Sequence, residues 1–389
     1  MTDLIVMLNL IIREIKILIS HPIYIIGMVI LPFVVALFFT TLMEDGQPTD
    51  MPIGIVDLDN TSTTRKLTRM IDAFQSSKVV AHYASVNDAR QAMQRNEVYG
   101  FILFPKDMTQ DMLSARQPKM SIYYSNTTLV AGTLLYKEMK TLCTLGSAAV
   151  GQATMQAKGV APEHIKAFLQ PVVIDAHNVG NPWVSYNIYL STMMVPCSML
   201  LFIFLLTVYS LGTEIKFGTQ TEWIAMAKGN LWYAMLTKLL PQTAVYTAVM
   251  YALMAYMFGI LHFPAPGGIG HLLVLGLLVV IAAQGFAVFM FGLIPSMRMA
   301  MSICSLWGVL GFSMVGSAFP VFAMDAPLQT LSWLFPIRHY YIIYQQCVFN
   351  TNSLSDVFPH VAALIICAFM PLLVAGRIGK AFREFDYKP

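Results

Sequence analysis

Long uninterrupted apolar runs constrain this chain more than any other feature. Six of them are each long enough to cross the roughly 30 Å of hydrocarbon in a bilayer as a helix. The composition agrees, because 57% of the 389 residues are hydrophobic and only 12% are charged, roughly half the charged fraction of soluble domains. The sequence therefore predicts a polytopic α-helical membrane protein with six transmembrane helices. The expected spans cover residues 23–43, 188–211, 232–261, 271–293, 299–319 and 358–376.

The distribution of basic residues predicts how these spans are oriented. Outside the long polar segment 44–185 the chain has 11 Lys and Arg. If successive spans cross the membrane in opposite directions, ten of these residues fall on the same side. Only Arg338 falls on the other side. Because Lys and Arg accumulate on the cytoplasmic side, both termini, including the tail 377–389, are expected in the cytoplasm. The net charge of +3 is too small to indicate a nucleic-acid partner.

Residues 1–22 are expected to form a cytoplasmic interfacial helix. Asn9, Arg13, Lys16 and Ser20 recur at helical spacing as one polar stripe, and Leu and Ile cover the rest of the surface. A helix of this kind lies in the membrane interface, with Arg13 and Lys16 near anionic lipid headgroups. The alternative is that this segment simply begins the first span.

The segment 44–185 differs sharply in composition from the rest of the chain. It holds 13 Lys and Arg and 13 Asp and Glu, and it is long enough to have its own core. Strand and helix patterns alternate along it, which predicts an extracytoplasmic α/β domain inserted between the first two spans. Expected strands cover 53–56, 79–84, 99–104 and 120–124, and expected helices cover 63–74, 86–95, 107–116 and 129–158.

The predicted α/β domain has no recognisable catalytic motif. Asp57, Asp59 and Asn60 resemble part of a cation-binding loop, but the remaining calcium ligands and the glycine are missing. A strand end followed by a helix N-cap explains these residues better. The segment has no GxSxG, HExxH or phosphate-binding loop. A binding or gating domain is therefore expected, with no metal or cofactor on this chain.

The loop 212–230, between the second and third spans, is short and charged, and we call it the inner loop. Lys216 and Lys228 flank it, so it is expected to face the cytoplasm. Thr219 is a plausible N-cap and Glu222 follows three residues later, which is the spacing of a capping box and predicts a short helix. Such a helix, held between two spans, is well placed to be displaced by a conformational change of a soluble partner. The alternative is an interfacial linker.

Residues 320–356 are too broken by proline and polar groups for a simple span, yet too apolar for an exposed loop. We expect a re-entrant or interfacial helix pair at the outer surface, which would seal the exit of a dimer. An anionic substrate headgroup could bind at Arg338 and His339, although an aromatic-belt anchor is the favoured interpretation. The residues that give this region its character are Trp333, Phe335, Pro336, Arg338, His339, Tyr340, Tyr341 and Tyr344.

The predicted spans hold few ionisable residues. A proton-driven carrier uses a buried series of Asp, Glu or His, and no such series is expected here. Gln284, inside the fourth span, is expected to form an interhelical hydrogen bond in preference to a substrate contact. If the protein moves a solute uphill, the free energy is therefore expected to come from a partner.

The order of elements resembles the permease subunit of ABC-2 type exporters, and most closely the bacterial drug-export permeases with a large extracytoplasmic insert after the first helix. The inner-loop motif of that family, Glu-x-x-x-Gly-Thr-x-x-Glu-Leu, is similar to part of the loop 212–230. Trp223 replaces the aliphatic residue, and the proline that usually follows is absent. The matching residues are Glu214, Gly218, Thr219 and Glu222.

Two further segments carry the resemblance. The family's outer Leu-x-Pro-x-x-x-Tyr pattern is similar to Leu334-Phe-Pro336-Ile-Arg-His-Tyr340. The segment Tyr99-Gly-Phe-Ile-Leu-Phe-Pro105 is similar to a strand of the family's external domain. Together with the order of elements, the resemblance covers essentially the whole chain.

The resemblance implies a bacterial inner-membrane permease that works as a homo- or heterodimer with cytoplasmic ABC ATPase subunits, which would bind ATP and Mg²⁺. It implies amphipathic substrates such as drugs or lipids, and an external domain that meets substrate or a periplasmic adaptor. The residues expected to couple to the ATPase are Glu214, Lys216, Gly218, Thr219, Glu222 and Trp223. The main alternative is an ATPase-independent membrane receptor or interaction protein; a membrane-embedded enzyme is less expected.

Overall fold

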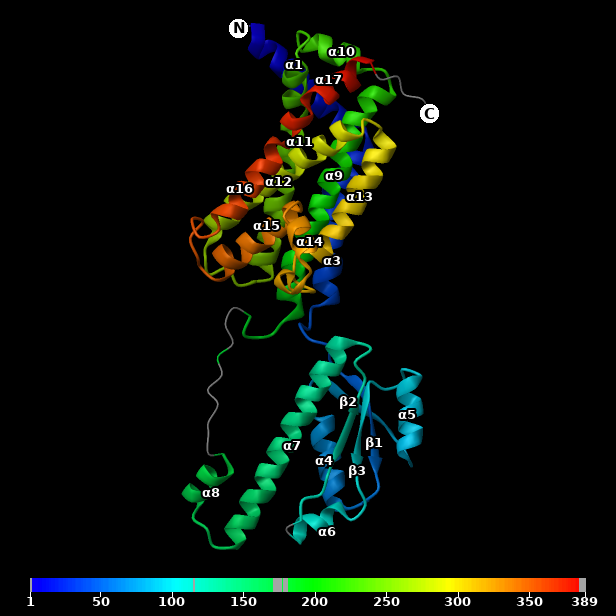
Figure 1. Cartoon of the computed structure of the whole chain (residues 1–389), viewed down its shortest axis with the longest axis vertical. Helices are drawn as coiled ribbons and strands as arrows, with labels where there is room; N and C mark the ends of the chain where they lie inside the picture. Colours follow the sequence, from blue (N-terminus) through cyan, green and yellow to red (C-terminus); the bar gives the residue numbers. More distant parts are fainter. Residues whose placement is uncertain (1, 115, 171–176, 178–180, 385–389) are drawn as a thin grey trace. The chain divides into compact units, whose positions relative to one another are not determined.

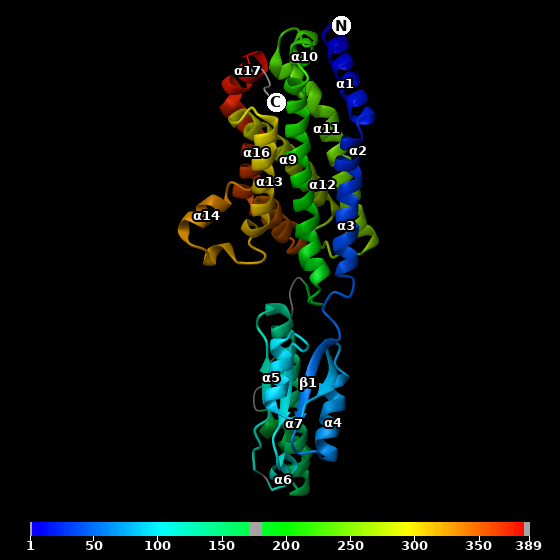
Figure 2. The same cartoon turned by 90° about the vertical axis from the view of Figure 1, so that its right-hand side faces the viewer.

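The computed structural model describes residues 2–114, 116–170, 177 and 181–384. The chain divides into two compact units. The helical unit comprises Met1–Glu44 and Ser185–Pro389, and the α/β unit comprises Asp45–Val184 (Figures 1 and 2). These divisions adjoin the boundaries expected at residues 44 and 185.

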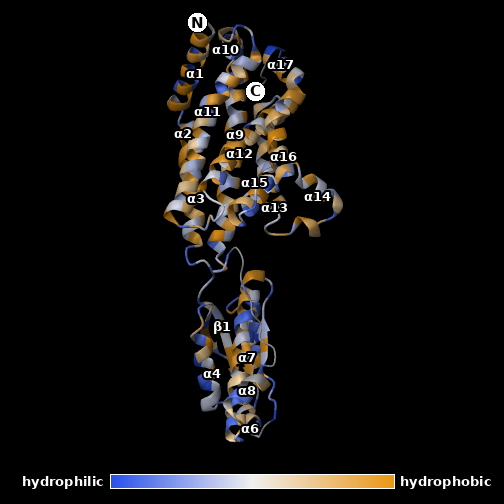
Figure 3. Cartoon of the chain, turned by 90° about the vertical axis from the view of Figure 1, so that its left-hand side faces the viewer, coloured by the Kyte–Doolittle hydropathy of each residue, from blue (hydrophilic) through white to orange (hydrophobic). Residues whose placement is uncertain are grey.

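The helical unit contains six helical stretches, within the described chain, that are long and apolar enough to cross a membrane. Each overlaps one predicted span, and apolar residues dominate their colouring in Figure 3. The stretches are α2 (Pro22–Ile25) with η1 (Ile26–Ile30) and α3 (Leu31–Leu42), η2 (Asn187–Ser191) with α9 (Thr192–Lys216), α11 (Leu231–Met254) with η3 (Ala255–Ile260), α12 (Ile269–Leu293), α13 (Met297–Met314), and α16 (Phe358–Phe369) with η6 (Met370–Val374) and α17 (Ala375–Glu384).

Further helices lie at the two ends of the helical unit. The α10 end carries α1 (Thr2–Ser20), α10 (Gln220–Met226) and α17 (Figures 1 and 2). The α14 end carries η4 (Val321–Ala323), α14 (Ala326–Ser332), α15 (Pro336–Ile343) and η5 (Tyr344–Phe349). Residues 320–356 thus form two α-helices flanked by shorter helical turns, and their place at an outer membrane surface stays a prediction. Eight residues of the expected C-terminal tail belong to α17, and residues 385–389 lie outside the described chain.

The first helix is separate from the first span. Backbone angles at His21 are extended, so α1 ends at Ser20 and α2 starts anew at Pro22. Proline suits the first turn of a helix because the amide hydrogen that it lacks would have no intrahelical partner there. Of the two expectations for this segment, a distinct helix is the correct one.

Helix α12 packs against α9, α11 and α16, and two glycines let α16 and α17 come close to it. A Cβ on Gly285 would lie 2.5 Å from the Ala368 carbonyl oxygen, and one on Gly292 would lie 2.6 Å from the Val374 side chain. The two glycines are two helical turns apart and therefore share one face. Small residues of this kind permit close backbone contact between membrane helices.

The α/β unit is built on a four-stranded sheet in the order β2-β1-β3-β4. Strand β1 (Met51–Asp57) pairs in parallel with β2 (Ser77–His82) and with β3 (Gly100–Phe104), whereas β4 (Ser121–Tyr124) is antiparallel to β3. The helices are α4 (Ser62–Asp72), α5 (Val86–Gln94), α6 (Met108–Leu113), α7 (Leu129–Ala157) and α8 (Pro162–Leu169).

Helices cover both faces of this sheet. In Figure 1, α4 and α7 lie against one face and α5 lies against the other. The side chains of β1 alternate accordingly: Ile53 and Ile55 join the core under α4 and α7, and Val56 joins the core under α5. This alternation follows from the two-residue repeat of a strand.

The carboxylates at the end of β1 and just after it stabilise a turn. Asp57 ends β1, and its Oδ1 accepts the backbone N–H groups of Asp59 and Asn60 at 3.1 and 2.9 Å. Thr61 is the N-cap of α4. The described residues contain no group of three or more side chains placed to bind a metal ion. The interpretation as a strand end is confirmed, with the cap at Thr61.

Substitution of Gly285 by alanine tests the contact between α12 and α16. The added methyl group would collide with the α16 backbone, so we expect a loss of about 1–3 kcal/mol of stability, as for overpacked cores. Gly259→Ala is the matched control, since a Cβ there meets no atom within 4 Å. Thermal unfolding in mild detergent should show a lower melting temperature for Gly285→Ala only. Equal melting temperatures would contradict the close contact.

Candidate functional site

Helix α10 has one buried and one exposed side. It lies between two left-handed glycines, Gly218 with φ 68° and Gly229 with φ 75°, which let the chain turn sharply on either side of it. Trp223 is buried and only 1% exposed, whereas Glu222 and the preceding Lys216 are exposed. The short helix predicted in the loop 212–230 is therefore present, and one of its sides is exposed.

The start of α10 differs from the prediction. Thr219 occupies the N-cap position, but its backbone is helical, with φ −85° and ψ −5°, and its side chain makes no capping hydrogen bond. The Thr219 hydroxyl donates instead to the carboxylate of Glu214. The predicted capping box with Glu222 is wrong, because a capping side chain needs an extended N-cap backbone, whereas the backbone of Thr219 is helical.

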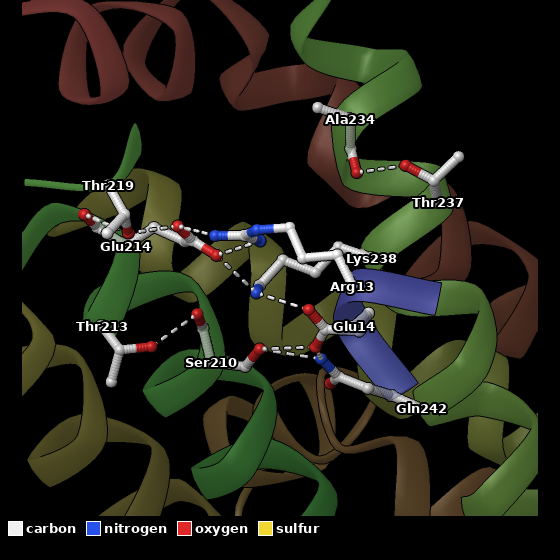
Figure 4. A network of polar contacts seen from close by, with 10 residues as sticks. All are labelled: Arg13, Glu14, Ser210, Thr213, Glu214, Thr219, Ala234, Thr237, Lys238 and Gln242. Atoms are coloured by element: carbon white, nitrogen blue, oxygen red, sulfur yellow. Dashed lines mark hydrogen bonds and ion pairs between the residues drawn. The ribbon is translucent and has the colours of Figure 1, made fainter. Parts of the chain in front are cut away.

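Glu214, near the end of α9, is the centre of a buried group of charges. It is 3% exposed, and its two oxygens accept both terminal nitrogens of Arg13 at 2.9 and 3.0 Å (Figure 4). The ammonium group of Lys238 donates to the same carboxylate at 2.9 Å. Arg13 comes from α1 and Lys238 from α11, so three helices meet at this side chain.

Glu14 supplies the second carboxylate. The Lys238 Nζ donates to Glu14 at 2.8 Å, and the amide of Gln242 donates to Glu14 at 2.7 Å and to the Ser210 hydroxyl at 2.8 Å (Figure 4). Glu14 is 1% exposed and Lys238 is 2% exposed. We call Arg13, Glu14, Glu214 and Lys238 the ion cluster. Its two acids and two bases balance in charge.

The ion cluster corrects three expectations. Arg13 has Glu214 as its partner instead of the expected lipid headgroups, whereas Lys16 is exposed on α1. Lys238 is a buried member of the cluster rather than a flanking charge at the end of a span. Ionisable residues are therefore buried at the α10 end, although few were expected in the spans. The available signal was the pair Lys238 and Gln242, four residues apart in an apolar run.

Trp223 connects α10 to two further helices. The Lys238 Nζ lies 5.6 Å from the centre of its ring, within the range of a cation–π contact. The Phe382 ring of α17 meets the Trp223 ring edge-on at 5.4 Å, and Phe382 in turn lies 5.9 Å from Phe291 of α12. The buried side of α10 is thus in contact with α11 and α17, and through α17 with α12.

A histidine pair is buried at the α14 end. His339 of α15 is fully buried; its Nε2 lies 2.8 Å from the Trp333 carbonyl oxygen and its Nδ1 lies 2.9 Å from the Nδ1 of His360. A carbonyl only accepts, so Nε2 carries the proton and Nδ1 accepts from His360. Burial, reinforced by the charges of His360 and Arg338, lowers the pKa of His339 to about 4.

The other predicted residues of this region form part of the packing. Pro336 begins α15, and Tyr340 is fully buried. Arg338 donates to the Ser332 hydroxyl at 2.6 Å, and its guanidinium carbon lies 6.0 Å from the centre of the Trp333 ring. His339 is enclosed and is not available to a headgroup, which corrects one expected role.

Gln284 forms the interhelical bond that its position predicted. Thr243 of α11 donates to Oε1 of Gln284 on α12, and Gln284 is 4% exposed. Neighbouring membrane helices often hold a buried amide in this way, since an unpaired amide in hydrocarbon is costly. The predicted interhelical hydrogen bond is confirmed.

The comparison with known families agrees with this architecture. A family model described as ABC-2 family transporter protein matches residues 22–377, from the start of the first candidate span to within the last. The chain belongs to the ABC-2 transporter family. No curated protein gives a match to the sequence. This ABC-2 chain is therefore a multi-pass membrane protein, and membrane proteins of its family typically partner with an ATPase subunit.

Removing one charge from the ion cluster should destabilise this ABC-2 protein. Lys238→Met leaves two carboxylates with one cation, and loss of one partner from a buried ion pair costs about 3–5 kcal/mol. The double variant Lys238→Met with Glu14→Gln restores the balance and should lose much less than the sum of the single losses. Thermal unfolding of the four proteins in detergent measures this coupling. Additive losses would contradict a cluster.

The histidine pair predicts acid sensitivity. Because the pKa of His339 is lowered to about 4, the neutral side chain contributes fully to the free energy of unfolding above pH 6.5. This contribution declines as the pH falls towards 4. At pH 5 the loss should be about 2 kcal/mol. His339→Gln keeps a donor for the Trp333 carbonyl but does not titrate. Melting curves at pH 7.5 and 5 should show a smaller decrease for this variant; an equal decrease would place the acid sensitivity elsewhere.

Proposed function

We propose that this ABC-2 chain is the permease subunit of an ATP-driven exporter and that α10 is its coupling helix. The two-sided nature of α10 is the observation that supports this most. Glu222 is exposed on this short helix, and Lys216 is exposed at the end of α9 just before it, where a soluble ATPase subunit can contact them. The opposite side presents Trp223 to the interior of the helical unit.

Pressure on α10 would be transmitted to several helices at once. Thr219 and Glu214 link the start of α10 to α9, and the ion cluster links α9 to α1 and α11. Trp223 links α10 to α17. Because buried charges keep their partners as they move, a shift of α10 would move these helices together. In this proposal Glu214 and Trp223 transmit the motion, while Lys216, Gly218 and Glu222 form the contact surface.

Basic residues support an orientation with the α10 end in the cytoplasm. Arg13 and Lys16 of α1, Lys216 and Lys228 next to α10, and the basic residues of α17 all belong to this end. The positive-inside bias then places both termini inside. The α/β unit is inserted after α3 and before η2, which are joined at the α14 end by a hydrogen bond from Asn187 to the Thr40 carbonyl. It would therefore lie outside the cytoplasm.

The remaining parts of the proposal follow from family membership. The permease would work as a homo- or heterodimer in the bacterial inner membrane with ABC ATPase subunits that bind ATP and Mg²⁺. Amphipathic drugs or lipids are the substrate class that we propose, moved outward. The α/β unit would meet the substrate or a periplasmic adaptor. A role for α15, including Pro336 and Tyr340, in closing the outer exit belongs to the same proposal.

Purification of the tagged chain in mild detergent tests the partner. An ABC ATPase should co-purify with the wild-type chain, and Glu222→Lys should lower its yield severalfold because the substitution reverses an exposed charge on α10. Asp325→Lys is the matched control, since Asp325 is exposed at the α14 end and its side chain makes no capping hydrogen bond. Mass spectrometry of the eluate gives the identity and stoichiometry of the ATPase.

The buried side of α10 needs a different measurement. Glu214→Gln should reduce the melting temperature more than Glu222→Gln, because only Glu214 lies in the ion cluster. A permease that purifies alone under every condition would contradict the proposal and favour an ATPase-independent receptor.

A further inference from the structure

A basic groove lies at the α10 end, between the start of α11 and one face of α17. Its volume is about 570 Å³. Lys228 and Trp232 line it from the α11 side, and Lys380 and Arg383 line it from α17. Glu384 is the only acidic residue among the described residues that line it. The groove therefore favours an anionic ligand, since its cations outnumber its acids.

Two glycines of α17 keep this groove open. A Cβ on Gly376 or on Gly379 would meet no atom within 4 Å, and both residues line the groove. Gly376, Gly379, Lys380 and Arg383 are spaced by three, four and seven residues and so share one helix face. The opposite face of α17, with Ile378 and Phe382, is buried. The helix is thus anchored on one side and presents cations over an open space on the other.

The groove continues into exposed apolar surface on both sides. On α11, Trp232 is followed at four-residue intervals by Leu236 and Leu240, both exposed. Immediately before α17, Leu372 and Leu373 are exposed. Both segments belong to candidate membrane spans. The site therefore joins a cationic pocket, an interfacial tryptophan and two apolar surfaces, which is the arrangement that a lipid headgroup and its chains require.

We infer that this groove binds an anionic phospholipid. The headgroup phosphate would lie among Lys228, Lys380 and Arg383, and the acyl chains would lie along Leu236 and Leu240. Free phosphate would use only the cations, and the acidic surface of a protein would leave the apolar strips uncovered. Basic pockets between membrane helices bind acidic headgroups by the same chemistry.

The bound lipid would also influence α10. Phe382 directly precedes Arg383 and makes the edge-on contact with Trp223 at 5.4 Å. A headgroup held by Lys380 and Arg383 would therefore stabilise α17 in the position that supports the buried side of α10. The inference needs no ATPase, so its test is independent of the proposed function.

The test measures lipid binding to the delipidated full-length chain. Phosphatidylglycerol should bind and raise the melting temperature, while phosphatidylcholine and inorganic phosphate at equal concentration should have little effect. Lys380→Gln with Arg383→Gln should weaken phosphatidylglycerol binding about tenfold or more, because two cations near the headgroup are lost. Arg377→Gln is the matched control, since Arg377 is exposed on α17 but does not line the groove. Native mass spectrometry gives the affinities.

Two further measurements test lipid binding in the groove if the double variant folds poorly. Gly379→Leu fills the groove without changing charge and should also weaken binding. In the wild-type chain, phosphatidylglycerol with brominated chains should quench tryptophan fluorescence more than brominated phosphatidylcholine does, and Trp232→Phe should remove that difference.

Each alternative ligand of the groove predicts a different experimental result. Equal binding of the two lipids would overturn the inference in favour of nonspecific lipid contact. Displacement of the lipid by inorganic phosphate would show a phosphate site instead. Unchanged lipid binding in the double variant, together with loss of a co-purifying ATPase, would assign the groove to a protein partner.

Discussion

Four paired charges determine how the α10 end of this protein is assembled. Arg13, Glu14, Glu214 and Lys238 are held by contacts of 2.8–3.0 Å. Arg13 is partly exposed, but the other three are buried and could not be left unpaired in an apolar interior. Their pairing fixes α1 against α9 and α11, although the paired residues are 201 and 224 positions apart in the chain. The ends of these three helices therefore form one structural element. Helix α10 is attached to it through Thr219 and Trp223.

This attachment explains how a short surface helix can influence the whole helical unit. Packed interiors transmit displacements because they have little free volume. From Trp223 the contacts reach Phe382 and then Phe291 of α12, and Gly285 brings the α12 backbone against α16. A displacement of α10 thus has two routes: one through paired charges to α1, α9 and α11, and one through aromatic rings to α17, α12 and α16.

Hydropathy was sufficient to locate the spans, and strand–helix alternation located the elements of the α/β unit except α8, because both signals are local in sequence. The ion cluster was not predictable in this way. Arg13 recurs with Asn9, Lys16 and Ser20 as a polar stripe, which indicated lipid headgroups as its partner. Lys238 lies close enough to a span end to count as a flanking charge. The capping box was also not decided locally: the backbone of Thr219 is helical, and its hydroxyl donates to Glu214, whose carboxylate is held by partners on other helices.

The depth of Lys238 accounts for the position of α1. Lys238 is six residues beyond the interfacial Trp232 on α11, which at 1.5 Å per residue places it about 9 Å further along the helix. A lysine at that depth needs a counter-charge. Glu214 alone is already paired with Arg13, so Glu14 is required as the second acid. Helix α1 must therefore lie against α11, which buries Leu10 and Leu18 and leaves its other face, with Leu4, Leu8 and Ile12, exposed. The position of α1 thus follows from the charge of Lys238 as much as from the hydrophobicity of α1 itself.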